Sequence, residues 1–242
     1  MRRVERQDFS ADNEQRRGFS IWARSTQSNR NMAISRYISV VQRRGFVVDD
    51  TQAIILPLIE PLFQIDTHMS YEERIELFRL AWESPQGFVA AEIGSYLGAS
   101  TAFMAAAATI RNGHVHAIDT WRNDAMPDAP GEDTFDRFQE NTRLFKHVIT
   151  AHRGRADAMS ERIPALDLLF IDGDHSFEGT KSDLSHYAHK VKPGGLLIMH
   201  DFNYDTVRSA AGEQLPIDTL KNVSRIQSLQ AFRIELQPAA AG

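Results

Sequence analysis

The sequence predicts an α/β fold in which short strands alternate with helices, and two observations support it. Five short apolar runs follow Gly87, with segments of helical spacing between them. Strands and helices that alternate in this way form βαβ units, whose strands lie parallel in one sheet. Two further apolar segments, Val223–Gln227 and Phe232–Leu236, are close enough to form an antiparallel hairpin. We therefore expect an open, doubly wound, mostly parallel sheet that ends in a C-terminal antiparallel hairpin.

Each element follows from its own pattern of apolar residues. The parallel strands are expected at Phe88–Ile93, His114–Ile118, Val148–Ala151, Leu166–Ile171 and Leu196–Met199. The helices between them are expected at Ser100–Arg111, Thr134–Phe145, Asp157–Ile163 and Glu178–Lys190. The first of these helices has Ser100 or Thr101 as its expected N-cap.

The first third of the chain lacks this alternation and is expected to be a helical extension. Residues 1–30 are polar and have no clear period, whereas helical spacing occurs in residues 31–45 and again in Thr51–Phe63. Ser70 followed by Glu73 is a capping box, which predicts the start of another helix that ends before Gly87. We therefore expect residues 1–84 to form an arm and a helical lid or oligomer contact, and residues 85–242 to form the main domain.

Composition limits the class of protein. The chain has 242 residues, of which 42% are hydrophobic and 24% charged, as in ordinary globular domains. It has no Cys, which excludes disulfides, thiolate zinc sites, iron–sulfur clusters and a cysteine nucleophile. No apolar run approaches the roughly 20 residues of a membrane span, and we expect a cytoplasmic protein without membrane contact.

The net charge of −5 is unevenly distributed. Residues 1–45 contain ten Arg and four acidic residues, a net charge of +6, which leaves −11 for the rest of the chain. The arginines lie among Gln, Asn and Ser without interleaved aromatic residues, which favours a solvated or oligomer-contacting arm over a nucleic-acid-binding one. We expect a homo-oligomer and no nucleic-acid partner.

Ligands of such sheets bind beyond the carboxyl ends of the strands, so the residues after each strand are the candidates for a site. The first strand ends in Glu92 and continues through Gly94 and Gly98, whose lack of a Cβ lets a ligand approach the backbone. The G-x-G-x-x-G and P-loop patterns are absent, which disfavours a bound pyrophosphate. Glu92 is suited to neutralise or hydrogen-bond a cationic group.

The second and third strands add groups suited to a nucleoside. Asp119 ends the second strand, where an acid can hold both hydroxyls of a ribose, and Trp121 is placed to stack on a base. The loop from Thr120 to Glu132 is long enough to suggest a function. Asp157 follows the third strand and is either a ligand contact or a helix N-cap.

The fourth and fifth strands end in acids and histidines. Asp172, Asp174 and His175 follow the fourth strand, and His200 and Asp201 follow the fifth. Carboxylate-rich sites suit Mg²⁺ or Mn²⁺, and a histidine near its ordinary pKa is a natural general base. Helix capping alone accounts for Asp174 or Ser176 but not for the whole set.

These motifs together resemble the class I S-adenosylmethionine-dependent methyltransferases, which have a Rossmann-like fold. The similarity rests on Glu92–Gly98, Ala117–Asp119, Phe170–Gly179 and the segment from Lys192 to Asp201, and it covers about residues 85–237. The acidic motifs are similar to the bacterial branch that includes cephalosporin-hydroxylase-like, macrolide-modifying and sugar-modifying O-methyltransferases. The first 84 residues match no motif of this family.

The resemblance assigns roles by position. It implies that S-adenosylmethionine contacts the following residues: Glu92, Gly94, Ser95, Tyr96, Gly98, Ser100, Asp119, Thr120, Trp121, Arg155, Ala156, Asp157 and Asp172. It further implies that Asp172 and Asp201, with His200, hold Mg²⁺ or another divalent cation, and that His175 is the general base. His200 stands where the family usually has an acid, which favours a softer ion.

The resemblance implies an O-methyltransferase that acts on a hydroxyl of a small molecule such as a sugar, a polyketide or macrolide, or a phenolic natural product. Four alternatives are weighed: a metal-independent methyltransferase that uses His175 or His200, a non-catalytic cofactor-binding protein, a nucleic-acid methyltransferase, whose Asn-Pro-Pro-Tyr-type motif is absent, and an NAD(P) oxidoreductase. The missing dinucleotide motif disfavours the last of these.

Overall fold

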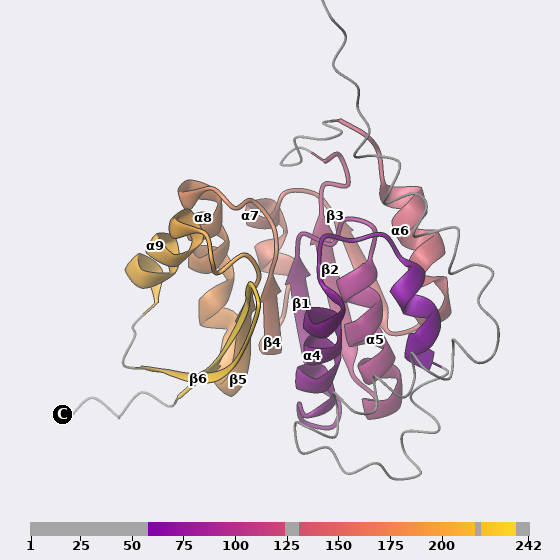
Figure 1. Cartoon of the computed structure of the whole chain (residues 1–242), viewed down its shortest axis with the longest axis horizontal. Coiled ribbons are helices and arrows are strands. Elements are labelled where there is room, and N and C mark those ends of the chain that lie inside the picture. Colours follow the sequence, from indigo (N-terminus) through magenta and orange to yellow (C-terminus); the bar gives the residue numbers. More distant parts are fainter. Residues whose placement is uncertain (1–57, 124–130, 216–218, 236–242) are drawn as a thin grey trace, which may run out of the picture. The chain divides into compact units, whose positions relative to one another are not determined.

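The computed structural model describes residues 58–123, 131–215 and 219–235 (Figure 1). The basic arm, the helix expected in residues 31–45 and most of the loop between Thr120 and Glu132 lie outside the described residues. One compact unit spans Leu58–Gly242. None of the helices within the described ranges is long and apolar enough to cross a membrane.

The predicted α/β sheet is confirmed. Seven strands form one sheet in the order β3-β2-β1-β4-β5-β7-β6. The first five strands pair in parallel, and β7 pairs antiparallel with both β5 and β6. The strands are β1 (Val89–Ile93), β2 (His114–Asp119), β3 (Ile149–Arg153), β4 (Leu166–Ile171), β5 (Val191–Met199), β6 (Leu220–Ile226) and β7 (Leu229–Ile234).

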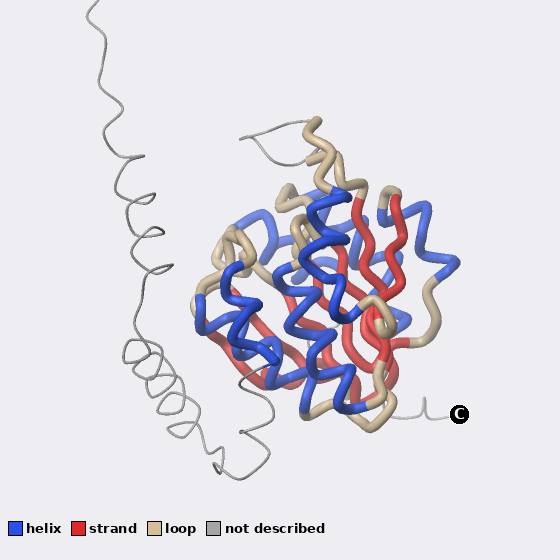
Figure 2. Tube along the Cα trace, turned by 90° about the vertical axis from the view of Figure 1, so that its right-hand side faces the viewer, coloured by secondary structure: helices blue, strands red, loops and turns tan. Residues whose placement is uncertain are grey.

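Helices cover both faces of this sheet, and Figures 1 and 2 show the strands between them. The α-helices are α4 (Tyr71–Trp82), α5 (Ala99–Arg111), α6 (Phe135–Thr142), α7 (Ala156–Met159), α8 (Phe177–Tyr187) and α9 (Asp205–Gln214). Short 3-10 turns are η1 (Glu60–Gln64), η2 (Arg143–Phe145), η3 (Ser160–Arg162) and η4 (Ala188–Lys190). Helices α4, α5 and α6 lie on one face, and α7, α8 and α9 on the other (Figure 1).

The core follows from the alternation of side chains along each strand. Ala91 and Ile93 of β1 face the α8 and α9 side, where they join a buried cluster with Leu184 and Val207. On the other face, Ala117 packs in a smaller aromatic cluster. Because the central strands are covered on both faces, they are apolar along nearly their whole length, as the sequence indicated.

The N-terminal helical pattern is confirmed where it is described. The capping box at α4 is present: the Glu73 amide donates to Ser70 Oγ, and the Ser70 amide donates to Glu73 Oε2. The described end of the helix expected at Thr51–Phe63 passes into the turn η1. Helix α9 was not predicted, because its mostly polar, weakly periodic sequence gives little signal.

Candidate active site

Two adjoining cavities lie at the carboxyl ends of the parallel strands. The larger has a volume of about 400 Å³ and the smaller about 80 Å³. The larger is lined by eight predicted cofactor residues: Gly94, Tyr96, Asp119, Thr120, Arg155, Ala156, Asp157 and Asp172. The smaller is lined by Gly94, Ser95, Tyr96, Ser100, Asp172, His175, His200 and Asp201. Gly94, Tyr96 and Asp172 lie on the border between the two.

Glycine is required at two positions after β1 because neighbouring parts of the chain approach its backbone closely there. Gly94 has a φ of +85°, and a Cβ built there would lie 2.1 Å from the carbonyl oxygen of Asp172. Gly98 has a φ of +83° and is the N-cap of α5, where a Cβ would lie 2.7 Å from the Thr142 side chain. The backbone of β1 therefore meets that of β4 at the point where both cavities begin. Gly98 itself lines neither cavity.

The predicted roles of Glu92 and of the α5 cap need correction. The N-cap is Gly98, and Ser100 and Thr101 lie within the first turn of α5. Glu92 is fully buried, lines neither cavity and accepts a hydrogen bond from Thr101 Oγ1. Its side chain points into the α5 face of the sheet because Glu92 alternates with Ala91 and Ile93 along β1. Burial raises the pKa of Glu92 to about 7.

Asp119 ties the loop after β1 to the end of β2. Its Oδ2 accepts hydrogen bonds of 2.8 Å from the amides of both Ser95 and Tyr96, and its Oδ1 accepts one of 2.6 Å from the amide of Trp121. The same side chain lines the larger cavity. Asp119 thus organises the loop and faces the ligand space.

Trp121 does not face the ligand space, and the expected stacking on a base is wrong. Its side chain is fully buried between Phe135 and Phe138, with ring centroids 4.8 and 4.7 Å away. Its Nε1 donates a hydrogen bond of 2.9 Å to the carbonyl of Tyr96. The chain turns at Trp121 with a φ of +51°, which directs the ring back under the loop. Trp121 therefore supports the cavity from behind.

The segment after β3 lines the larger cavity, as predicted. Arg155 is the N-cap of α7, so Asp157 is not the cap but the second residue of this helix. The Arg155 guanidinium donates to both oxygens of Asp157, at 3.2 and 3.0 Å. Ser176 rather than Asp174 is the N-cap of α8 and accepts from the amide of Gly179.

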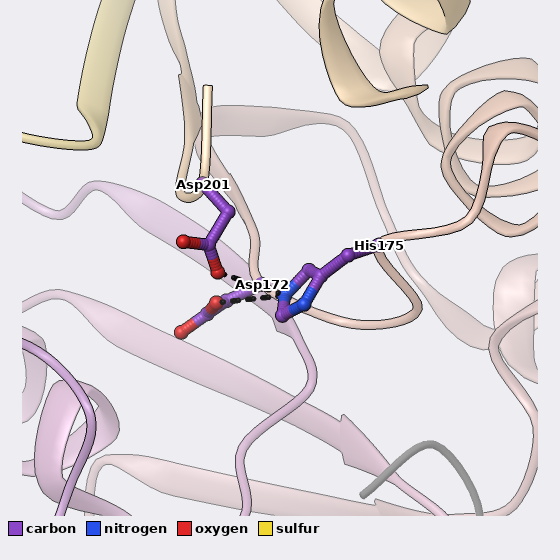
Figure 3. Close-up of side chains that lie close together, drawn as sticks. All are labelled: Asp172, His175 and Asp201. Atoms are coloured by element: carbon purple, nitrogen blue, oxygen red, sulfur yellow. Dashed lines mark ion pairs between the residues drawn. The ribbon is translucent and has the colours of Figure 1, made fainter. Parts of the chain in front are cut away.

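Four ionisable side chains from two loops meet at the smaller cavity. Asp172 and His175 follow β4, and His200 and Asp201 follow β5; Figure 3 shows three of them pointing toward one another. His200 Nδ1 lies 3.0 Å from Asp172 Oδ1 and 3.2 Å from Asp201 Oδ2. His175 Nε2 lies 3.6 and 3.2 Å from the same two oxygens. Each of the two imidazole nitrogens therefore lies within 3.6 Å of the same two carboxylate oxygens.

The electrostatics of this cluster follow from its burial and its mixed charges. Burial alone lowers the pKa of His200, but the carboxylates of Asp172, Asp201 and Glu73 outweigh this and raise it to about 12. Asp172 likewise has its pKa held below the ordinary value, because both histidines outweigh the effect of burial. The pKa of His175 is raised, chiefly by Asp172. The carboxylates thus require a positive charge beside them.

These residues fit a divalent cation. Asp172, His175 and Asp201 each offer a ligand atom within 4.8 Å of the others. His175 Nε2 and His200 Nδ1 are buried and have no hydrogen-bond partner of suitable geometry within the described ranges. Ligand atoms about 2.0–2.2 Å from one ion are themselves about 3.0–3.5 Å apart, close to the spacings found here. This set of three residues shares Asp172 and Asp201 with the predicted ligands but has His175 in place of His200, whose Nδ1 lies 3.0 and 3.2 Å from the same two carboxylates.

Sequence reasoning missed several residues of the site, and three of them are polar or ionisable groups that bear on its chemistry. Glu73 of α4 and Ser228 of the β6–β7 turn contact His200 from behind. Asp183 of α8 lines the larger cavity, and burial raises its pKa to about 7. The capping box marked Glu73 only as a helix start, and the other two residues have no sequence signal, because their contacts exist only in the folded chain.

Comparison with known proteins gives a family match for the central part of the chain. Residues 91–202 match a family model described as a methyltransferase domain. A curated protein of Sinorhizobium fredii, the uncharacterized protein y4gI, is 25% identical over 87 residues, which are 35% of this chain and 10% of that protein. The matching part therefore spans about a tenth of the length of this relative.

Solved structures show the same fold. The O-methyltransferase NovP superposes with a TM-score of 0.55 and 14% identity, over 76% of this chain and 98% of that one. A putative caffeoyl-CoA O-methyltransferase from Staphylococcus aureus superposes with a TM-score of 0.54 and 16% identity, over 84% of this chain and 99% of that one. The TDP-rhamnose 3'-O-methyltransferase CalS11 superposes with a TM-score of 0.52 and 14% identity, over 78% of this chain and 97% of that one. Residues 91–202 therefore match a methyltransferase domain, the solved structures share its fold, and the chain has a cavity at the strand ends where such a fold binds its ligand.

Proposed function

We propose that this chain transfers the methyl group of S-adenosylmethionine to a hydroxyl oxygen of a small molecule, with the help of a divalent cation and a histidine base. The observation that carries the proposal is the cluster of Asp172, His175, His200 and Asp201 at the smaller cavity. An N-methyltransferase that accepts a neutral amine has less need for such a cluster, because its acceptor already has a lone pair.

The cofactor is proposed to lie across the two cavities. The ribose hydroxyls would bind at Asp119 and the adenine near Arg155–Asp157, in the larger cavity. The methionine part would lie along Gly94–Tyr96, on the border of both cavities. In this arrangement the sulfonium methyl group would lie next to the smaller cavity, where the acceptor hydroxyl would enter.

The reaction is a displacement in line with the breaking bond. The acceptor oxygen forms a bond to the methyl carbon, the carbon–sulfur bond breaks, and its electron pair stays on sulfur as S-adenosylhomocysteine. Since the sulfonium is already a good leaving group, the protein must align the acceptor and remove its proton. His175 is 38% exposed against 5% for His200, so it is the histidine that an acceptor can reach, and it is the proposed base that takes the proton.

The cation would be held by Asp172, Asp201 and His200. When bound, it lowers the pKa of the acceptor hydroxyl and fixes its position. The buried His200 is suited to be a ligand because its ring is held from behind, as metal-bound histidines usually are. Mg²⁺ suits the two carboxylates, whereas the imidazole shifts preference toward Mn²⁺ or a softer ion.

The acceptor class is proposed from the small cavity beside the ionisable cluster and from the structural neighbours. The neighbours include one enzyme described as acting on TDP-rhamnose and one as a putative caffeoyl-CoA O-methyltransferase. A sugar, a polyketide or macrolide, or a phenolic natural product therefore remains the proposed acceptor. We further propose that the protein works as a cytoplasmic homo-oligomer, with residues 1–84 as a lid or oligomer contact.

The decisive experiment replaces His175 with Ala and measures three quantities. S-adenosylhomocysteine affinity and Mn²⁺ affinity, both by calorimetry, should stay within about threefold of wild type, while turnover on a panel of hydroxyl acceptors falls by about 10²-fold or more. Loss of Mn²⁺ affinity would make His175 a ligand instead of the base. Full activity of the wild type after exhaustive chelation would favour the metal-independent alternative, in which a histidine acts alone.

A further inference from the structure

Glu73 connects helix α4 to the ionisable cluster through contacts that its capping role does not need. It is 2% exposed, although it is a carboxylate on a helix. Its Oε2 accepts from the Ser70 amide at 2.8 Å and completes the capping box. Its Oε1 accepts from Ser228 Oγ at 2.6 Å and from the amides of Ser228 and Leu229 at 3.0 and 3.2 Å, and it lies 3.4 Å from His200 Nε2.

These contacts determine which nitrogen of His200 carries hydrogen. A serine hydroxyl has one proton to donate, and Ser228 Oγ donates it to Glu73, since an ionised carboxylate only accepts. Ser228 Oγ also lies 3.1 Å from His200 Nε2, so in this second bond the hydroxyl oxygen must accept. Nε2 therefore carries the hydrogen and donates to Ser228 Oγ. Nδ1 faces Asp172 and Asp201, so it is the nitrogen that gives up its proton when a cation binds there, while Nε2 keeps its hydrogen.

We propose that Glu73 is a positioning residue for the cation site: with Ser228 it fixes the Nε2–H tautomer of His200 and directs the Nδ1 lone pair between Asp172 and Asp201. This inference rests on the proposed cation site. A carboxylate behind a coordinating histidine orients the ring and makes it a stronger ligand. Here that carboxylate comes from α4, a helix outside residues 91–202 that match the methyltransferase family.

Glu73→Gln is the informative variant because it keeps the shape of the side chain. Gln is also acceptable at this position of a capping box. The amide nitrogen can donate to Ser228 Oγ, which frees the hydroxyl proton to turn toward His200 Nε2. The ring then loses its fixed tautomer, and the negative charge behind it is gone. Ser70→Ala is the matched control: it removes the hydroxyl that caps α4 and leaves every contact of Glu73 Oε1 in place.

The experiment titrates the cofactor-free full chain with Mn²⁺ by calorimetry and with Co²⁺ by visible absorption, whose bands report the ligands of the ion. Glu73→Gln should bind both ions about 10- to 100-fold more weakly, with a changed Co²⁺ spectrum. Ser70→Ala should match wild type in both. Ser228→Ala, which removes the hydroxyl between the two groups, should weaken binding in the same direction and serves if Glu73→Gln fails to fold.

The outcomes separate this inference from the proposed function. Wild type that binds neither ion overturns both the cation site and the role of Glu73. The role of Glu73 alone is overturned if Glu73→Gln keeps the wild-type affinity and spectrum, and the cation site then stands. If only Ser228→Ala folds, the same result in that variant has the same meaning. Equal losses in Glu73→Gln and Ser70→Ala overturn it as well, because they trace the effect to the packing of α4.

Discussion

Replacing Gly94 with Ala tests how closely the loop after β1 must approach the end of β4. A Cβ at Gly94 would lie 2.1 Å from the backbone carbonyl oxygen of Asp172, whereas ordinary contact begins at 3.4 Å. The ends of the two strands would therefore have to separate by about 1.3 Å, the difference between these distances. The Asp172 amide donates a 2.8 Å hydrogen bond to the carbonyl of Ile93, and this separation would break it.

Substitutions at two other glycines separate the contributions of backbone strain and of steric contact to the free-energy cost of Gly94→Ala. Gly212 in α9 meets no described atom within 4 Å, so Gly212→Ala should be neutral or stabilise by up to about 1 kcal/mol. Gly194 has the same open surroundings but a φ of +83°, so Gly194→Ala should cost only the backbone strain, about 1–2 kcal/mol. Gly94→Ala carries that strain, a lost hydrogen bond of about 1 kcal/mol and the displaced backbone, which together should cost about 3 kcal/mol or more.

Urea unfolding followed by circular dichroism measures the free energy of unfolding of all three variants. Calorimetry with S-adenosylhomocysteine measures their affinity for this ligand, which reports on the cavity. Gly94→Ala should lose at least tenfold in affinity, because Gly94 lines both cavities. The two control variants should bind as wild type. Gly94→Ala that is as stable as Gly194→Ala and binds normally would refute the reasoning, since it would mean that the two strand ends can separate freely.

Two further predictions test the corrected residues. Trp121→Phe removes the hydrogen bond to the Tyr96 carbonyl and part of a buried ring, so it should lower the free energy of unfolding by about 1–3 kcal/mol. Its affinity for S-adenosylhomocysteine should change less than about threefold. Strongly weakened affinity at unchanged stability would instead restore a stacking role for Trp121. For Glu92, burial raises the pKa from 4.5 to about 7, so the folded state keeps a proton that the unfolded state releases. This contribution to stability is complete below pH 4.5 and is lost as the pH rises through 7, by about 3 kcal/mol in total. Urea unfolding of wild type and Glu92→Gln between pH 4 and 8 should show a steeper decline in wild type, because the raised pKa of Asp183 contributes equally to both proteins, and parallel curves would contradict the prediction.

The order of the elements could be predicted because it depends on local pattern. Apolar runs of strand length, such as Leu166–Ile171, are buried on both faces and need no knowledge of their neighbours to be recognised. The parallel arrangement follows from the helices between them, so the strand ends had to meet at one edge of the sheet. For this reason the positions of Asp119, Asp172 and Asp201 at strand ends are enough to predict that they lie near a common site.

The direction of single side chains could not be predicted in the same way. Glu92 and Trp121 both border the ligand-binding edge in sequence, yet each turns into the aromatic and helical layer on the α5 and α6 face. A shift of one residue along a strand, or one positive φ in a loop, decides which face a side chain joins. That choice depends on what fills the space behind it, which no local pattern records.

Local pattern was enough to predict the α/β sheet, the glycine loop at Gly94 and Gly98, and the acids and histidines that end β4 and β5, because periodicity and strand ends are local properties. The position of His200 between two carboxylates, with Glu73 behind it, follows instead from how distant parts of the chain pack together. Glu73 and Ser228 are 155 residues apart in the chain and meet only when α4 packs beside the β6–β7 turn. Contacts of that range follow from packing, whose free energy is shared across the whole core.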